Sequence, residues 1–200
     1  MAGVKVRARV LLAVEPVHVD LHRGYPVCRR HKRATSNALA LEIAAEAKLL
    51  DLQRELRAHT YHPGRSVCFV TGGPKPCEVF AAAFRDRVVH HLLVAHLERV
   101  FEPSFIHDSY ACRMGKGTLA ASDQLTRFLR QLTANGRRPG WALKLDVASF
   151  FASIGKDTPY ALITARVADP ELRWLSRTIL FHDPSVSSGR RPTGRAPASA

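Results

Sequence analysis

The sequence has few cysteines and lacks a long apolar run, and the two absences exclude several classes of protein. Its cysteines show no close pairing and no metal-ligand spacing, which argues against a disulfide framework or a zinc module; they are Cys28, Cys68, Cys77 and Cys112. The first 27 residues hold only a short apolar run, Val10 to Val14, interrupted at once by Glu15 and Pro16. That run is too short for a signal or membrane segment, so we expect a cytoplasmic protein with no membrane partner.

Acidic residues are scarce relative to basic ones. The 200 residues include 30 Lys and Arg against 17 Asp and Glu, giving a formal net charge of +13 and a sequence pI near 10.4. A hydrophobic content of 46% fits a folded domain with a core rather than a disordered chain. Nucleic acid is the first partner that such a charge suggests. The alternative is a basic protein from an arginine-rich genome, with no polyanionic ligand.

The stretch from Trp141 to Ile154 has the most informative pattern. Apolar residues alternate with Ala142, Lys144 and Asp146 up to Val147, which predicts a half-buried strand with Asp146 near its end. A carboxylate at the tip of a core strand is a common metal ligand. It is equally a common cap, because an Asp just past a strand accepts hydrogen bonds from the following backbone N–H groups.

Residues Lys144 to Ile154 read Lys-Leu-Asp-Val-Ala-Ser-Phe-Phe-Ala-Ser-Ile, which resembles the first catalytic motif of bacterial reverse transcriptases. That group includes the retron, group II intron and diversity-generating retroelement enzymes. Further stretches upstream follow the order of the same family: Tyr61 to Gly64, Lys75-Pro76, Phe84 to His91, and Ser109 to Thr118. Together the matching stretches cover roughly residues 28 to 182.

The resemblance implies an RNA-directed DNA polymerase of the α+β class, comprising the fingers and part of the palm of a right-hand polymerase. Its partners would be an RNA template, a DNA primer and deoxynucleoside triphosphates. Residues 28–184 would form this domain, and residues 1–27 fall outside the resemblance. Residues 185–200 are rich in Ser, Gly, Arg, Pro and Ala without periodicity, so we expect a disordered tail.

The resemblance also implies roles for particular residues. Asp146 matches the aspartate that binds two catalytic Mg²⁺ ions, and the carbonyl of Val147 helps to hold one of them. Phe151 matches the aromatic residue that excludes a 2′-hydroxyl and so selects deoxynucleotides. Its neighbour Phe150 is expected in the core; core packing is the simpler interpretation for both.

Two basic stretches match segments that contact nucleotides and nucleic acid. Lys75 matches a lysine that meets the triphosphate, although the family's following arginine is replaced by Cys77, which cannot make a bidentate phosphate contact. The second stretch matches template and primer contacts through Arg113, Gly115, Lys116 and Gly117. An exposed turn lysine and a plain glycine-rich loop are the corresponding structural alternatives.

One expected motif is missing from the sequence. The family's second catalytic motif, Tyr-x-Asp-Asp, does not occur, and the chain has no Asp-Asp pair. We therefore expect a fragment, truncated before this motif and the thumb, that does not polymerise without a downstream chain carrying the rest of the palm and thumb. The unpaired strand edge would make it poorly soluble. The alternatives are a non-catalytic RNA-binding module and a decayed gene product.

Hydrophobic periodicity and turn residues predict the remaining elements. The Cys28 to Arg33 cluster leads into the first expected helix, Asp169 is the expected cap of the last, and Asp86 is expected to pair with a neighbouring arginine. The predicted helices are Ser36 to His59, Ala82 to Val100, an amphipathic run through Leu125 to Leu132, Pro159 to Val167 and Pro170 to Phe181, and the predicted hairpin joins Arg65 to Val70 with Cys77 to Ala81.

Overall fold

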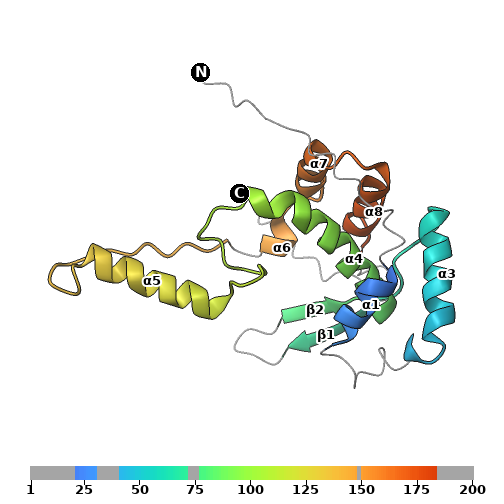
Figure 1. Cartoon of the computed structure of the whole chain (residues 1–200), viewed down its shortest axis with the longest axis horizontal. Coiled ribbons are helices and arrows are strands. Elements are labelled where there is room, and N and C mark those ends of the chain that lie inside the picture. Colours follow the sequence, from blue (N-terminus) through green and yellow to red (C-terminus); the bar gives the residue numbers. More distant parts are fainter. Residues whose placement is uncertain (1–20, 31–40, 72–76, 148–149, 184–200) are drawn as a thin grey trace, which may run out of the picture. The chain divides into compact units, whose positions relative to one another are not determined.

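The computed structural model describes residues 21–30, 41–71, 77–147 and 150–183 (Figure 1). These residues form a mixed structure of helices and one two-stranded sheet. In chain order the elements are α1 (Leu21–Arg29), α3 (Ala45–Arg57), β1 (Val67–Thr71), β2 (Cys77–Ala81), α4 (Phe84–Phe101), the 3₁₀ helix η1 (Glu102–Ser104), α5 (Thr118–Leu132), α6 (Phe150–Ser153), α7 (Asp157–Arg166) and α8 (Pro170–Leu180).

The chain divides into two compact units. The first unit comprises residues 1–98 and 156–200, and the second comprises residues 99–155. The described core of the first unit is formed by apolar side chains from α3, α4, α7 and α8, namely Leu49, Leu52, Leu56, Phe84, Val88, Val89, Leu92, Leu93, Ile163, Leu172 and Leu175. Burial of these side chains, at about 25 cal/mol per Å² of apolar surface, is the main stabilising contribution to this unit.

The predicted hairpin is present in the first unit. Strands β1 and β2 pair antiparallel, with Val67 opposite Ala81 and Thr71 opposite Cys77 (Figure 1). Helix α4 follows after a two-residue connection and buries the expected face, including Val88 and Leu92. Local periodicity and turn residues were sufficient to predict both elements, because the signal for each lies within a short stretch of sequence.

Two other helix predictions have different outcomes. The helix expected from Ser36 to His59 is broken at Ala44, whose φ of 61° is left-handed, so α3 begins only at Ala45. The expected start of this helix at Ser36 lies outside the described residues. The cap at Asp169 is confirmed, because its Oδ1 accepts hydrogen bonds from the backbone N–H of Glu171 at 2.8 Å and of Leu172 at 3.4 Å.

The second unit is built around the amphipathic helix α5. Its apolar face carries Leu125, Phe128, Leu129 and Leu132, which are 39–55% exposed. After the helix the chain reverses through three successive left-handed residues, Ala134, Asn135 and Gly136, with φ values of 48°, 57° and 82°. Gly140 then approaches the helix so closely that a Cβ atom there would lie 2.9 Å from Thr133 Cγ2.

The predicted strand from Trp141 to Val147 is wrong, because no strand forms over these residues. The side chains expected on a buried face are exposed instead: Trp141 by 93%, Leu143 by 84%, Leu145 by 81% and Val147 by 61%. A strand needs a neighbour for its backbone N–H and C=O groups, and β1 and β2 pair only with each other in the described residues. Residues 141–147 therefore have the alternating sequence pattern of a strand but no neighbouring strand to pair with among the described residues.

Candidate functional site

A buried carboxylate joins two of the stretches that resemble the polymerase family. Asp86, near the start of α4, is 1% exposed, and its Oδ1 accepts a hydrogen bond from the Tyr61 hydroxyl at 2.9 Å. Its Oδ2 accepts the backbone N–H of Gly64, also at 2.9 Å. The expectation that Asp86 pairs with a neighbouring arginine is wrong, because Arg85 instead pairs with Glu55 and the Arg87 Nε–H donates to the Ala82 carbonyl at 2.9 Å.

Several contacts fix the Tyr61 side chain beside Asp86. It is fully buried, and the Arg85 guanidinium lies over its ring, 5.4 Å from the centroid. Burial raises the pKa of the Tyr61 phenol well above its ordinary value, and the adjacent Asp86 carboxylate adds to that rise. The phenol therefore stays protonated and donates to Asp86. A Cβ atom at Gly64 would lie 3.3 Å from Asp86 Oδ2, so glycine permits this close approach.

The nucleotide-binding prediction concerns the turn of the hairpin. Lys75 lies outside the described residues, so its contact with a triphosphate stays a prediction. Cys77, at the position where the resemblance implies an arginine, begins β2 opposite Thr71. Asp86 and Gly64 lie just beyond the two open ends of this hairpin in sequence, so their hydrogen bond holds the chain segments that flank it.

His90 of α4 carries a pH-dependent contribution to stability. Burial lowers the pKa of His90 from 6.5, the nearby His91, His182 and Arg87 lower it further, and Asp86 opposes the shift. The neutral form is therefore favoured in the folded state, so the contribution is fully present above pH 6.5 and is lost as pH falls towards the lowered pKa.

We expect His90→Gln to flatten the decline in unfolding free energy between pH 6.5 and pH 5, measured by urea titration at several pH values. The matched control is His62→Gln, because the side chain of His62 is exposed to solvent. A His90→Gln profile parallel to that of the wild type would contradict this assignment.

The glycine loop before α5 is organised by Arg113. Its guanidinium donates to Glu102 Oε1 through Nε at 2.9 Å and through Nη2 at 2.7 Å, and its Nη1 donates to the carbonyls of Ile106 and Ser109 at 2.9 and 2.8 Å. The side chain is 10% exposed. Arg113 thus links the two ends of the loop through hydrogen bonds. To contact nucleic acid as predicted, its guanidinium would have to exchange these hydrogen bonds for hydrogen bonds to phosphate.

The other predicted residues of this loop are arranged around the same turn. Lys116 donates to the His107 carbonyl, and its Nζ lies 5.0 Å from the centroid of the Tyr110 ring. Gly115 and Gly117 have φ values of 69° and 121°, which L side chains rarely adopt. Both glycines allow the loop backbone to adopt these positive φ values. Their contacts with template and primer stay predictions.

Asp146 is placed in an exposed segment of the second unit. Its Oδ1 accepts a hydrogen bond from the backbone N–H of Val147 at 2.9 Å, which is the local capping arrangement that the sequence allowed as an alternative. Phe150 is 48% exposed in α6, so its expected place in the core is wrong. Phe151 belongs to the same short helix, but its side chain lies outside what the structure describes, and its role as a nucleotide gate stays a prediction.

The described residues do not fit a site for two Mg²⁺ ions. Such a site requires several oxygen ligands converging on each ion. Within the part of the chain that the structure describes, no three Asp, Glu, His or Cys side chains gather where they could hold a metal ion. The metal-binding roles expected for Asp146 and the Val147 carbonyl, and the Mg²⁺ cofactor itself, stay predictions.

Comparison with known proteins gives one informative similarity. No family model matches the chain. The chain is 28% identical over 122 residues to an uncharacterized 91 kDa protein in a cob intron of Schizosaccharomyces pombe. The similar region covers 60% of this chain but 14% of that protein, so the chain spans a small part of the relative's length. This similarity links the chain to an intron-associated protein, in loose agreement with a retroelement origin.

The sequence predicts no membrane partner, and the length and hydropathy of each helix bear on this prediction. None of the helices formed by the described residues combines the length and apolar character required to cross a bilayer.

Proposed function

We propose that this chain is part of an RNA-directed DNA polymerase of the intron type, and that its own contribution is to bind RNA. The observation that carries the proposal is the hydrogen-bonded contact of Asp86 with Tyr61 and Gly64. It unites two sequence stretches that separately resemble the family, so they form one structural unit. The similarity to a protein in a cob intron and the net charge of +13 support the same proposal.

In this proposal polymerisation belongs only to the complete enzyme. Asp146 would supply one carboxylate to its active centre, and further segments would supply the others. The chain by itself lacks an Asp-Asp pair, and Asp146 is exposed with only a local hydrogen bond. RNA binding does not require that centre, because contacts with phosphates depend on basic side chains distributed over the surface.

The test compares the chain with Asp146→Ala and with Asp51→Ala, an exposed aspartate in a surface ion pair with Arg54. We expect no primer extension on an RNA template above the Asp146→Ala background, and equal RNA affinities for all three proteins. RNA affinity should fall steeply with added salt. Extension that Asp146→Ala abolishes would overturn the statement that the chain does not polymerise alone. Absence of RNA binding by the wild type would overturn the proposed function.

A further inference from the structure

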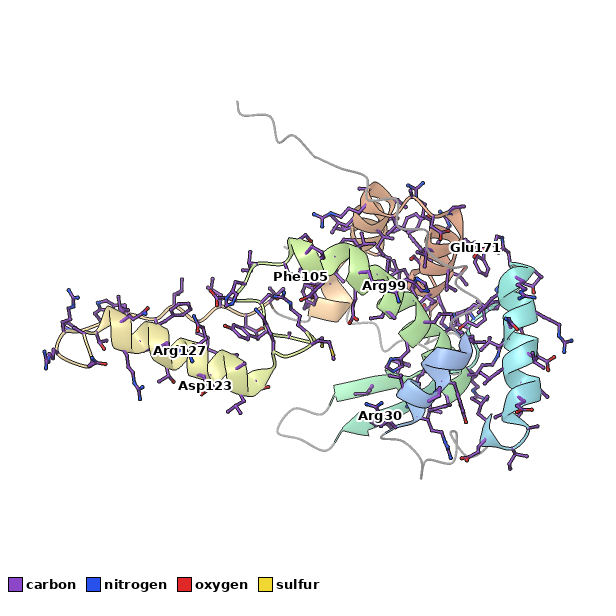
Figure 2. All side chains as sticks on the ribbon, viewed as in Figure 1. Arg30, Arg99, Phe105, Asp123, Arg127 and Glu171 are labelled. Atoms are coloured by element: carbon purple, nitrogen blue, oxygen red, sulfur yellow. The ribbon has the colours of Figure 1, made fainter. Side chains whose placement is uncertain are left out.

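Helices α7 and α8 form an antiparallel pair in the first unit (Figure 1). The start of α7 meets the end of α8, because Lys156 Nζ donates to the His182 carbonyl at 3.0 Å. The end of α7 meets the first half of α8, because Arg173 Nη2 donates to the Thr164 carbonyl at 2.9 Å. Figure 2 labels Glu171, which lies in the first turn of α8. The two helices therefore contact each other along most of their length.

An arginine contacts two aromatic rings near the end of α8. The Arg177 guanidinium carbon lies 5.8 Å from the centroid of the Tyr160 ring and 5.4 Å from that of the Phe181 ring. The two rings also contact each other edge to face, with centroids 5.8 Å apart and planes at 85°. A cation is attracted to the face of an aromatic ring at such distances. The two rings, one from each helix, therefore restrict the position of the guanidinium.

Lys156 lies beside this group of side chains. It precedes α7 directly and is four residues before Tyr160, whose N–H donates to the Lys156 carbonyl at 3.3 Å, so both residues lie on one side of the helix. Its Nζ also reaches the carbonyl of His182, the residue after Phe181. These contacts place Lys156, Tyr160, Arg177 and Phe181 on one surface, and we call these four residues the α7–α8 cluster.

The hydrogen-bond donors of Arg177 are not used by the fold. Arg173, one turn earlier on α8, donates to the carbonyls of Val167 and Thr164. Arg177 is exposed, and its side chain forms no hydrogen bond or ion pair with any residue that the structure describes. Its N–H groups are therefore available to a ligand, although the guanidinium is held by the two rings. Lys156 is also exposed and uses one of its ammonium protons.

A positioned guanidinium with unused donors is suited to a phosphate group. Its planar fork binds two phosphate oxygens through parallel hydrogen bonds, and a fork that is already held in place loses less conformational entropy on binding. The neighbouring ammonium is a second point charge for phosphate. RNA carries a phosphate at every nucleotide, so two adjacent cations can contact neighbouring phosphates whatever the base sequence.

We propose that the α7–α8 cluster is a phosphate-binding site for RNA. Arg177 contacts one phosphate through two N–H groups, Lys156 contacts a neighbouring phosphate, and Tyr160 and Phe181 position the guanidinium. The inference rests on the proposed function and gives RNA binding a location. Because both contacts are with the RNA backbone, they require neither a particular base sequence nor the Asp146 carboxylate.

The test uses the full chain and a fluorescently labelled single-stranded RNA of mixed sequence, with anisotropy measured at several salt concentrations. The site variant carries Lys156→Gln and Arg177→Gln. The matched control loses the same charge from two exposed arginines of the first unit through Arg30→Gln and Arg57→Gln; Arg30 is labelled in Figure 2. Two single variants, Arg177→Lys and Phe181→Leu, keep the net charge unchanged.

The site variant should bind RNA at least about tenfold more weakly than the control. Its slope of log affinity against log salt should be smaller by about 1.4, because each phosphate contact on a single strand contributes roughly 0.7. Arg177→Lys should weaken binding by about threefold, because an ammonium cannot make the bidentate contact. Phe181→Leu should weaken it by about twofold, because one of the two rings that hold the guanidinium is then missing.

Three outcomes would overturn the inference and leave the proposed function standing. Equal losses in the site variant and the control would show that net charge alone governs binding. Wild-type affinity in both Arg177→Lys and Phe181→Leu would contradict a positioned, bidentate contact. Unchanged RNA affinity in the site variant together with reduced self-association would assign the cluster to a protein contact.

Absence of RNA binding by the wild type would instead overturn the proposed function itself. Circular dichroism of each variant should match that of the wild type, which excludes unfolding as the cause of a loss. If the site variant unfolds, the two variants that keep the net charge decide the question, because each changes a single side chain of the cluster.

Discussion

Replacing Asp86 with alanine is expected to lower the free energy of unfolding by about 3 kcal/mol, measured by urea denaturation of the full chain. The Tyr61 hydroxyl is fully buried and would lose its acceptor, as would the partly buried N–H of Gly64. A buried donor without a partner costs about 1–3 kcal/mol, and the two costs add because both donors depend on the same carboxylate.

The unfolding free energies of three further variants measure the separate contributions to this contact. Tyr61→Phe removes the phenolic donor and leaves Asp86 with Gly64, so the loss should be about 1 kcal/mol. Asp86→Asn keeps one acceptor oxygen and should lie between the wild type and Asp86→Ala. Asp51→Ala removes an exposed carboxylate paired with Arg54 and should change the unfolding free energy by less than about 0.5 kcal/mol. An Asp86→Ala protein as stable as Asp51→Ala would show that the buried contact does not stabilise the fold.

The position of Asp86 also connects stability with the proposed function. Gly64 lies three residues before β1 and Asp86 lies five residues after β2, so their hydrogen bond joins the two segments at the base of the hairpin. Loss of the contact should release both flanking segments. We therefore expect the amides of Val67 to Thr71 to exchange hydrogen faster in Asp86→Ala than in Asp51→Ala.

Elements held by local interactions were predictable from the sequence. The hairpin, α4, α7 and α8 follow from apolar periodicity and turn residues, and the cap at Asp169 follows from an aspartate before a proline. In each case the residues that determine the element are close together in the chain. The same reasoning does not locate the partner of a buried group. Asp86 meets Tyr61 across 25 residues, and no local pattern distinguishes that contact from a pair with an adjacent arginine.

The candidate site was less predictable for the same physical reason. The sequence marks Arg113 as a cation in a glycine-rich loop, but its hydrogen bonds with Glu102, Ile106 and Ser109 depend on the tertiary path of that loop. Spacing indicates a strand around Asp146 without supplying a neighbouring strand.

The exposed alternating segment leads to the other prediction with a large effect. Leu143 and Leu145 are 84% and 81% exposed, and they lie between Trp141 and Val147, which are also exposed. Such a segment presents unpaired backbone groups together with an apolar row, which favours pairing with another chain. In 0.5 M salt, where repulsion from the net charge of +13 is screened, the wild type should sediment mainly as species larger than 22.2 kDa.

The combined change Leu143→Ser and Leu145→Ser should convert most of this material to monomer and raise the soluble fraction several-fold, because it removes the apolar row but leaves the backbone intact. The matched control is Ala142→Ser with Lys144→Ser, which alters the interleaved positions and should leave self-association in place. A wild type that sediments as a single monomer and unfolds cooperatively would contradict the prediction. If both double variants stay associated, the side chains of the apolar row do not drive the association, and pairing through the backbone alone would have to account for it. If both become monomeric, the effect is not specific to the apolar row.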